Sequence, residues 1–384
     1  MGQSASISAW RRRGLPLAIG CALAALGALA FELYARWKLG PRFVFGVHVG
    51  SPQSILGEFD AELGWRNRCN ASATIALGAG EYRVTLNSRG ERGPERALEK
   101  RPGVKRVLVL GDSTAWGWGV DDAQTWTRLV ERELGGAVEL VNLAVPGYGT
   151  DQELWVLERE APRHQPDLVL LGFVHNDTLY NGKSDMQGMG KPMFARAADG
   201  TWSVENRPVP EPTGDAELAK KRARRLAAMY LASVKLFEPA PAQPTRYDLA
   251  NPKVQQGIER YWDGVLDPAT ATHHALEGLS SLCRERQVPL VVFHFPHLVD
   301  RWLYDPGTAV PPHAGDTPYE TYGTRTLAEA GRRLGFATFS IDAALLEVVS
   351  TGVDLDCGDE HLNARGNEIV AGVVSRELRA RLGL

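Results

Sequence analysis

The chain has 384 residues, of which 44% are hydrophobic and 23% charged, and its formal net charge at pH 7 is −3. This composition is that of an ordinary globular protein, and the length is sufficient for one large domain with additional segments. The small net charge gives no electrostatic reason to expect a nucleic-acid partner. The cysteine spacings match no zinc-binding pattern. The four cysteines are Cys21, Cys69, Cys283 and Cys357.

The N-terminal region contains a long uncharged segment. After a short tail at residues 1–14, no charged residue occurs from Gly14 to Phe31, a run of 18 residues rich in Leu and Ala. This length is at the lower limit for a helix that crosses a membrane. Residues 15–37 are therefore predicted to be either an uncleaved transmembrane anchor or a secretory signal segment, which is removed from the mature protein.

Both interpretations of this segment imply export. Cleavage after the small-x-small sequence Ala28-Leu29-Ala30 would release a signal peptide. We favour the anchor, because Tyr34 and Trp37 are suited to a membrane–water interface. The basic residues on the two sides of the segment are too evenly balanced to decide its orientation. Because a signal-like N-terminus implies export, we expect an inner-membrane protein whose main domain lies in the periplasm.

Residues 38–102 differ in character from the chain that follows. They are rich in glycine and contain short β-prone pieces, such as Tyr82–Leu86. Apolar residues that include Trp65 and Ile75 argue against the alternative of a simple linker, since a linker needs no side chains that pack. We therefore predict a small β-rich or extended accessory segment that packs on the main domain.

Residues 103–384 alternate between strand-like and helix-like segments. Short runs rich in β-branched residues are followed by segments with apolar residues at helical spacing. This alternation predicts an α/β domain with a central parallel sheet and right-handed crossovers. Glycine and proline clusters interrupt the alternation, and we predict an insertion at about residues 178–268. The predicted elements are strand Val107–Leu110, helix Thr125–Leu134, strand Val138–Leu143, a helix from Thr150 or Asp151 to about Ala161, strand Leu168–Phe173, helix Thr270–Arg286, strand Leu290–Phe295, helix Tyr319–Leu334, strand Ala337–Ile341 and helix Ala364–Leu382.

Several polar residues follow the predicted strands or lie in the last loop. Parallel strands bring their carboxyl ends to one edge of a sheet, where ligands bind. Acyl transfer needs a nucleophile, a base, and a group that orients the base. Ser113 can be the nucleophile, and His361 can be the base. Asp359, two residues before the histidine, can hold the imidazole in the required tautomer, and Asp356 is a second candidate for this task.

The same edge can supply donors for the oxyanion that forms during acyl transfer. The candidates are the backbone N–H groups of Ser113 and Gly147 and the side-chain amide of Asn176. An oxyanion hole built from donors of this kind is a main source of catalysis in such reactions. Ser113 alone could merely cap a helix. Together with these other residues, it is predicted to be part of an active site.

Aromatic residues near the predicted nucleophile are candidates for substrate contacts. Trp116 and Trp118 are predicted to line an acyl or sugar pocket, although aromatic residues fill protein cores equally well. His175 precedes Asn176 and is a further candidate, with a supporting or surface role as the alternative.

The residues at these positions resemble the sequence blocks of the SGNH hydrolase superfamily, the GDSL-type esterases and lipases. The blocks cover the chain from Val104 to its end, apart from the insertion, and they occur in the family's order. The resemblance implies a flavodoxin-like three-layer α/β/α fold, ester hydrolysis, and neither a metal nor an organic cofactor. The segment Asn87–Gly90 also looks like that of exported bacterial members. The matching blocks are Gly111–Ser113, Asn142–Gly147, Asn176–Asp177 and Asp359–Asn363, and the family's functional residues fall on Ser113, Gly147, Asn176 and His361.

Two positions depart from the family pattern. Val174 stands where the family usually has glycine, and Gly358 stands where it commonly has the aspartate that precedes the histidine by three residues. The Asp-x-His arrangement of Asp359 and His361 also resembles that of periplasmic polysaccharide O-acetyltransferases related to the family.

We expect a serine hydrolase that acts on an acyl or acetyl ester, such as one on a cell-surface glycan or lipid. The alternative is a polysaccharide O-acyltransferase that uses the same triad, because the two reactions differ only in whether water or a sugar hydroxyl accepts the acyl group. A catalytically silent carbohydrate- or partner-binding module is a third interpretation. The intact set of Ser113, Asn176 and His361 argues against it.

Overall fold

The computed structural model describes residues 19–34, 56–77, 80–186, 189–211, 262–295, 322–357 and 361–384. The chain divides into two compact units. In the described residues, the first unit contributes a helix at residues 19–34 and the second contributes the α/β domain. Each unit is considered by itself. The predicted tail at residues 1–14, much of the predicted insertion and Asp359 lie outside the described residues.

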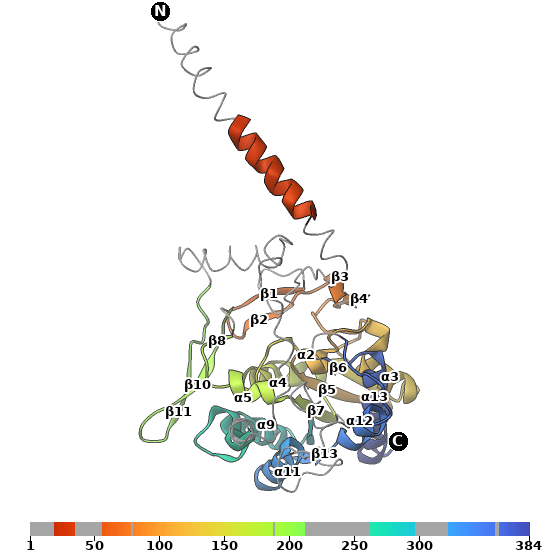
Figure 1. The fold of residues 1–384 in the computed structure, drawn as a ribbon. Helices are drawn as coiled ribbons and strands as arrows, with labels where there is room; N and C mark the ends of the chain where they lie inside the picture. Colours follow the sequence, from red (N-terminus) through yellow and green to blue (C-terminus); the bar gives the residue numbers. More distant parts are fainter. Residues whose placement is uncertain are drawn as a thin grey trace, which may run out of the picture. The chain divides into compact units, whose positions relative to one another are not determined.

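A five-stranded parallel sheet is the centre of the α/β domain (Figure 1). The strand order is β13-β12-β7-β5-β6, and all four neighbouring pairs are parallel. Numbered along the chain, this is the order 2-1-3-4-5 of flavodoxin-like folds, whose direction of winding reverses between the first and third strands. The predicted parallel sheet is therefore confirmed. The strands are β5 (Lys105–Gly111), β6 (Val138–Asn142), β7 (Leu168–Phe173), β12 (Leu290–His294) and β13 (Ala337–Phe339).

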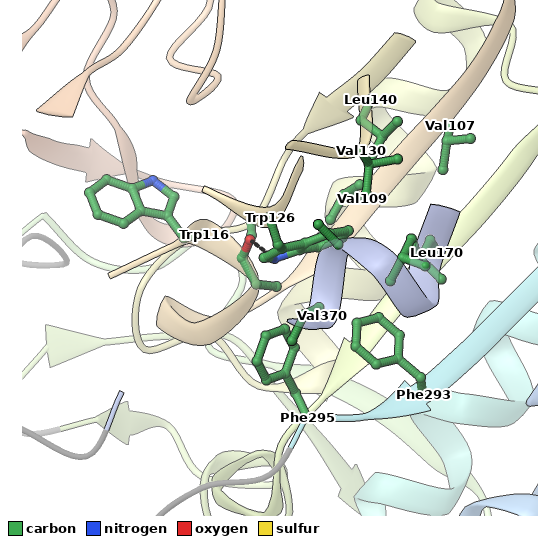
Figure 2. Close-up of a cluster of buried hydrophobic side chains, with 14 of the residues drawn as sticks. Val107, Val109, Trp116, Trp126, Val130, Leu140, Leu170, Phe293, Phe295 and Val370 are labelled. Carbon is green, nitrogen blue, oxygen red and sulfur yellow. Dashed lines mark hydrogen bonds between the residues drawn. The ribbon is translucent and has the colours of Figure 1, made fainter. Parts of the chain in front are cut away.

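Successive residues of the central strand β5 belong to two different cores, because strand side chains alternate between the faces of a sheet. Val107 and Val109 lie in one buried cluster, while Leu108 and Leu110 lie in the other. Figure 2 shows part of the first cluster, in which Trp126 and Val370 approach the valines of the sheet. Helices on both faces make a three-layer α/β/α arrangement. The first core includes α3 (Trp126–Glu133), α12 (Asp342–Val349) and α13 (Ala364–Leu382); the second includes α4 (Thr150–His164), α9 (Ala271–Glu285) and α11 (Tyr322–Leu334).

The predicted strands and long helices of this domain all occur, with boundaries that differ by a few residues. The clearest difference follows β13. The prediction extends this strand to Ile341, whereas the strand ends at Phe339 and helix α12 begins at Asp342. The residue at the N-terminal cap is Ile341, which makes no side-chain cap hydrogen bond. The Asp342 N–H instead donates to the hydroxyl of Ser340, one residue before the usual capping position.

The predicted accessory segment contains two small β-structures. β1 (Gly57–Asp60) pairs antiparallel with β2 (Gly64–Asn67), and β3 (Ser72–Leu77) pairs with β4 (Gly80–Thr85). Both contribute to the cores of the α/β domain: Trp65 is in the second cluster, and Ile75 is in the first. The segment is thus β-rich and packed, and the predicted boundaries of 38 and 102 remain predictions.

The described part of the predicted insertion contains several short strands, together with helical residues at its two ends. Phe194 of β10 packs against Trp155 of α4 and against His274 of α9, with ring centroids 5.0 and 4.8 Å apart. These contacts hold this part of the insertion on the α4–α9 face of the sheet. The strands are β8 (Asp185–Met186), β9 (Met189–Gly190), β10 (Met193–Arg196) and β11 (Trp202–Glu205).

The predicted transmembrane helix at residues 15–37 is described only at residues 19–34, where the chain is helical. In the described portion of the chain, none of the helices combines the length and the apolar character needed to cross a bilayer. The helix is present, and the membrane anchor at residues 15–37 remains a prediction.

Candidate active site

The turn after β5 presents Ser113 at the carboxyl edge of the sheet. Gly111 has φ +145°, and a Cβ atom at this position would lie 2.4 Å from Cβ of Ala115, so only glycine fits. Asp112 then caps the four-residue helix α2 (Ser113–Trp116) by accepting a hydrogen bond of 2.8 Å from the Thr114 N–H. Ser113 is therefore the first helical residue, and it is partly exposed.

His361 reaches Ser113 from the far end of the chain. The distance between Ser113 Oγ and His361 Nε2 is 2.8 Å, although 248 residues separate the two along the chain. This is hydrogen-bond distance, and the hydroxyl donates to Nε2 when the imidazole proton is on Nδ1. The Cys357 N–H donates to the His361 carbonyl at 2.9 Å, and Asn363 caps helix α13 by accepting from the Gly366 N–H at 3.1 Å. The histidine is thus held between a short turn and a capped helix.

The residue predicted to orient this histidine is outside the described residues, because Asp359 falls in the gap before His361. Asp356, the second candidate, is described, and its backbone forms an antiparallel bridge with Leu362. It therefore lies on the same turn as the histidine. The role of Asp359 remains a prediction.

Asn176 is connected to the serine through Asp112. It lies on helix α5 (His175–Tyr180), directly after β7, and its Nδ2 donates to Asp112 Oδ2 at 2.9 Å. Ser113 Oγ is 3.3 Å from the same oxygen. An amide nitrogen carries two hydrogens, and this contact uses one of them. Among the described residues, the second Asn176 N–H has no acceptor.

Two backbone N–H groups complete the predicted set of oxyanion donors. Gly147 has φ +81° in the loop between β6 and α4, and the Val145 N–H donates to the Gly111 carbonyl at 3.1 Å. This bond keeps the loop beside the end of β5. In the described parts of the chain, neither the Ser113 N–H nor the Gly147 N–H donates to another residue. These donors and Asn176 follow strands β5, β6 and β7, and their role as oxyanion donors remains a prediction.

The two tryptophans predicted to contact substrate have different surroundings. The Trp118 ring is half-buried, and its centroid is 5.8 Å from that of His361. Trp116 is fully buried in the first core cluster, so its indole does not line an open surface. The turn directs this side chain inward, and the substrate contact at Trp116 remains a prediction. His175 is half-exposed at the start of α5, and its role remains a prediction, as does that of Trp118.

A group of buried carboxyls lies near Asp112, and no pattern in the sequence predicts it. Glu153 of α4 is 1% exposed, and neither of its carboxyl oxygens has a hydrogen-bond partner in the described residues. Burial raises the pKa of Glu153 well above its usual range, and the nearby Asp112 and Asp151 raise this pKa further. Burial likewise raises the pKa of Asp177, with Glu153 and Asp112 as further causes. A glutamate in the first turn of a helix normally lies exposed near the positive end of the helix dipole. The burial of Glu153 was not predicted for this reason.

Glu153→Gln is expected to make folding stability less dependent on pH. When folding raises the pKa of a carboxyl, stability falls once the pH exceeds the unfolded pKa, about 4.3 for Glu, because the unfolded chain ionises first. Relative to wild type, the variant should therefore become more stable as the pH rises from about 5 to 8. Urea unfolding at both pH values measures this difference. Glu158→Gln, at an exposed position of the same helix, is the control. An equal stability difference at both pH values would contradict the expectation.

In the portion of the chain that is described, no group of three or more His, Cys, Asp or Glu residues is arranged to hold a metal ion. The side chains that converge on Ser113 are an imidazole, an amide and a carboxyl. Their arrangement provides a nucleophile, a proton acceptor and hydrogen-bond donors within one site.

Comparison with known proteins gives one family and several similar structures. The GDSL-like Lipase/Acylhydrolase family matches residues 109–369. No curated protein sequence matches the chain. The crystal structure of TesA is 15% identical over 72% of this chain and 99% of its own, with a TM-score of 0.38. The lipase/acylhydrolase from Enterococcus faecalis is 16% identical over 72% and 97%, with a TM-score of 0.36. The esterase EstA from Pseudoalteromonas sp. is 10% identical over 73% and 100%, with a TM-score of 0.35. The fold is assigned from the order and the parallel direction of the five strands, and not from these similarities.

Proposed function

Because the chain belongs to the GDSL-like lipase/acylhydrolase family, and is thus an enzyme that hydrolyses ester bonds, we propose that Ser113 is its nucleophile and His361 its general base. The observation that carries this proposal is the distance of 2.8 Å between Ser113 Oγ and His361 Nε2. A hydroxyl is a weak nucleophile until a base accepts its proton, and the base must lie within hydrogen-bond reach.

The proposed reaction proceeds in two halves. Ser113 Oγ attacks the ester carbonyl carbon while its proton passes to His361 Nε2, and the tetrahedral oxyanion receives hydrogen bonds from Ser113, Gly147 and Asn176. His361 then gives the proton to the leaving alkoxide, and an acyl-enzyme remains. Water attacks the acyl-enzyme, His361 accepts a proton from it, and the acid is released as Oγ regains its hydrogen. Asp359 is proposed to hold the Nδ1–H of the imidazole throughout.

The proposed substrate is an acyl or acetyl ester of a cell-surface glycan or lipid. Trp118 supports this choice, because a half-buried indole beside His361 offers an apolar face on which a sugar ring or an acyl chain can pack. The predicted export of the chain would bring the enzyme to such substrates. The alternative acceptor is a sugar hydroxyl, which would make the enzyme an O-acyltransferase with the same residues.

The full-length chain is expected to hydrolyse p-nitrophenyl acetate and to be labelled at Ser113 by a fluorophosphonate probe. Acid release is measured with and without an added glycan acceptor. Transfer of the acyl group to the glycan in place of acid release would favour the acyltransferase, and absence of both hydrolysis and labelling would refute the assignment. The same assay on fractionated cells tests the proposed inner-membrane anchor with a periplasmic domain. The activity should sediment with membranes and be released from them only by detergent.

A further inference from the structure

The short helix that carries Ser113 depends on side chains from other elements. A helix of four residues has carbonyl groups without intrahelical partners. The Ala115 carbonyl accepts from Trp126 Nε1 and from Asn142 Nδ2, both at 3.1 Å. Figure 2 shows the Trp126 indole directed at this hydrogen bond. Elements α3 and β6 thus hold one carbonyl of α2, and the next two carbonyls are held by a different part of the chain.

Arg92, from the accessory segment, binds the end of this turn. Its Nη1 donates to the Trp116 carbonyl at 3.3 Å and to the Gly117 carbonyl. Its Nη2 donates to the Val120 carbonyl at 2.6 Å, and its Nε donates to Asp122 Oδ1 at 3.0 Å. The guanidinium also lies 4.3 Å from the centre of the Trp116 ring. One buried side chain therefore fixes residues 116–122 as a unit.

The residues that Arg92 holds in turn hold Ser113. The N–H groups of Gly117 and Trp118 both donate to the Ser113 carbonyl, at 3.1 and 3.0 Å. Trp118 also packs beside His361. A shift of residues 116–120 would therefore move the backbone of the nucleophile and an aromatic contact of the base together.

We propose that Arg92 is a positioning residue that keeps Ser113 Oγ within reach of His361 Nε2, an inference that rests on the function proposed above. Only arginine offers a planar fork of five donors, which can bind several carbonyls at once. Lysine would keep the charge but would lose the fork. The accessory segment is on this basis a component of the active site.

The chain offers a matched control in Arg106. The side chains of Arg92 and Arg106 are both 1% exposed. Like Arg92, Arg106 donates to three carbonyls, those of Ala97, Leu98 and His164, at 3.0, 2.6 and 3.1 Å, and it pairs with one carboxylate, Glu139. It lies at the amino end of β5, however, roughly 20 Å from Ser113 at the usual rise per strand residue. Its loss should affect stability without affecting the nucleophile.

The test compares Arg92→Lys with Arg106→Lys in the full-length protein. Both variants should have a lower Tm. Arg92→Lys should also lower kcat for p-nitrophenyl acetate and the fluorophosphonate labelling rate by about 10- to 100-fold, with KM within about threefold, because displacement of a reacting group by 1 Å is enough for such a loss. Arg106→Lys should keep kcat within about twofold. A reduced Tm with wild-type kcat in Arg92→Lys, or equal kcat losses in both variants, would overturn the positioning role.

A milder variant covers the case in which Arg92→Lys does not fold. Asp122, whose side chain is 33% exposed, binds only Nε, so Asp122→Asn leaves the three carbonyl contacts in place while loosening the guanidinium. It should slow labelling by about threefold, and an unchanged rate would count against the proposal. Failure of the wild type itself to label would refute the proposed function, whereas a labelled wild type with an unaffected Arg92→Lys variant refutes the positioning role alone.

Discussion

Replacement of Ser113 by alanine is expected to lower kcat for p-nitrophenyl acetate by at least about 10⁴-fold, since loss of the nucleophile in serine hydrolases has effects of this size or larger. The variant should unfold at the wild-type temperature. Ser113 is partly exposed, and its Oγ contacts only His361 Nε2 and Asp112 Oδ2 in the described residues, so its removal leaves no cavity in the core. Fluorophosphonate labelling should be abolished.

The measurement is steady-state hydrolysis together with thermal unfolding. Ser203→Ala, at an exposed position on β11, is the control and should behave as wild type. Residual activity close to that of wild type in Ser113→Ala, with a contaminating esterase excluded, would remove the serine from the mechanism. A large loss of activity in a variant that is also unfolded would show that Ser113 is needed for folding, and it would not support a role in the chemistry.

Replacement of Asn176 by alanine is expected to lower kcat by about 10²- to 10³-fold with little change in KM, because an oxyanion donor acts mainly in the transition state. Loss of the Asn176 amide should also lower kcat through its contact with Asp112. Asn176 Nδ2 donates to Asp112 Oδ2, and Ser113 Oγ lies 3.3 Å from this oxygen. Without the amide, Asp112 would compete with His361 for the hydroxyl proton.

Asn181 provides a control on the C-terminal side of the same short helix. Its side chain donates to Thr272 Oγ1 at 3.0 Å and accepts from the Asp151 N–H at 3.1 Å, so it supports the structure without facing the serine. Asn181→Ala should lower Tm and leave kcat within about threefold, as expected for a residue with no contact to the reacting atoms. Wild-type kcat in Asn176→Ala would eliminate the amide as an oxyanion donor and leave the backbone groups of Ser113 and Gly147 for that task.

The fold could be predicted to the extent that hydrophobic periodicity determines it. The run Val107–Leu110 is apolar at every position. In the structure its side chains are buried in the cores on both faces of the sheet, as expected for a central parallel strand. The helix that begins at Asp342 was missed, because its capping position is Ile341 and the serine that binds its first N–H lies one residue earlier. The strand order itself follows from crossover lengths and packing that no single segment encodes.

Sequence position predicts which residues lie at the carboxyl ends of strands, but it does not predict the direction in which a side chain points. Ser113 and His361 were predicted to meet, and their atoms lie within hydrogen-bond distance. Trp116 and Trp118 are only two residues apart, yet the turn between them buries the first and places the second beside the histidine. Arg92 was missed because arginine is usually exposed. Nothing near it in the sequence indicates that its guanidinium donates to three backbone carbonyls.

The great separation of Ser113 and His361 along the chain has a consequence for biosynthesis. Helix α13, whose capping residue Asn363 follows the histidine by two positions, comes after the other described elements of the domain and leaves the ribosome after them. Until it docks, the hydroxyl of Ser113 has no imidazole beside it. A nascent polypeptide, or one still threaded through a translocon, is on this basis a dormant hydrolase. The site becomes complete only when helix α13 has packed against the rest of the domain.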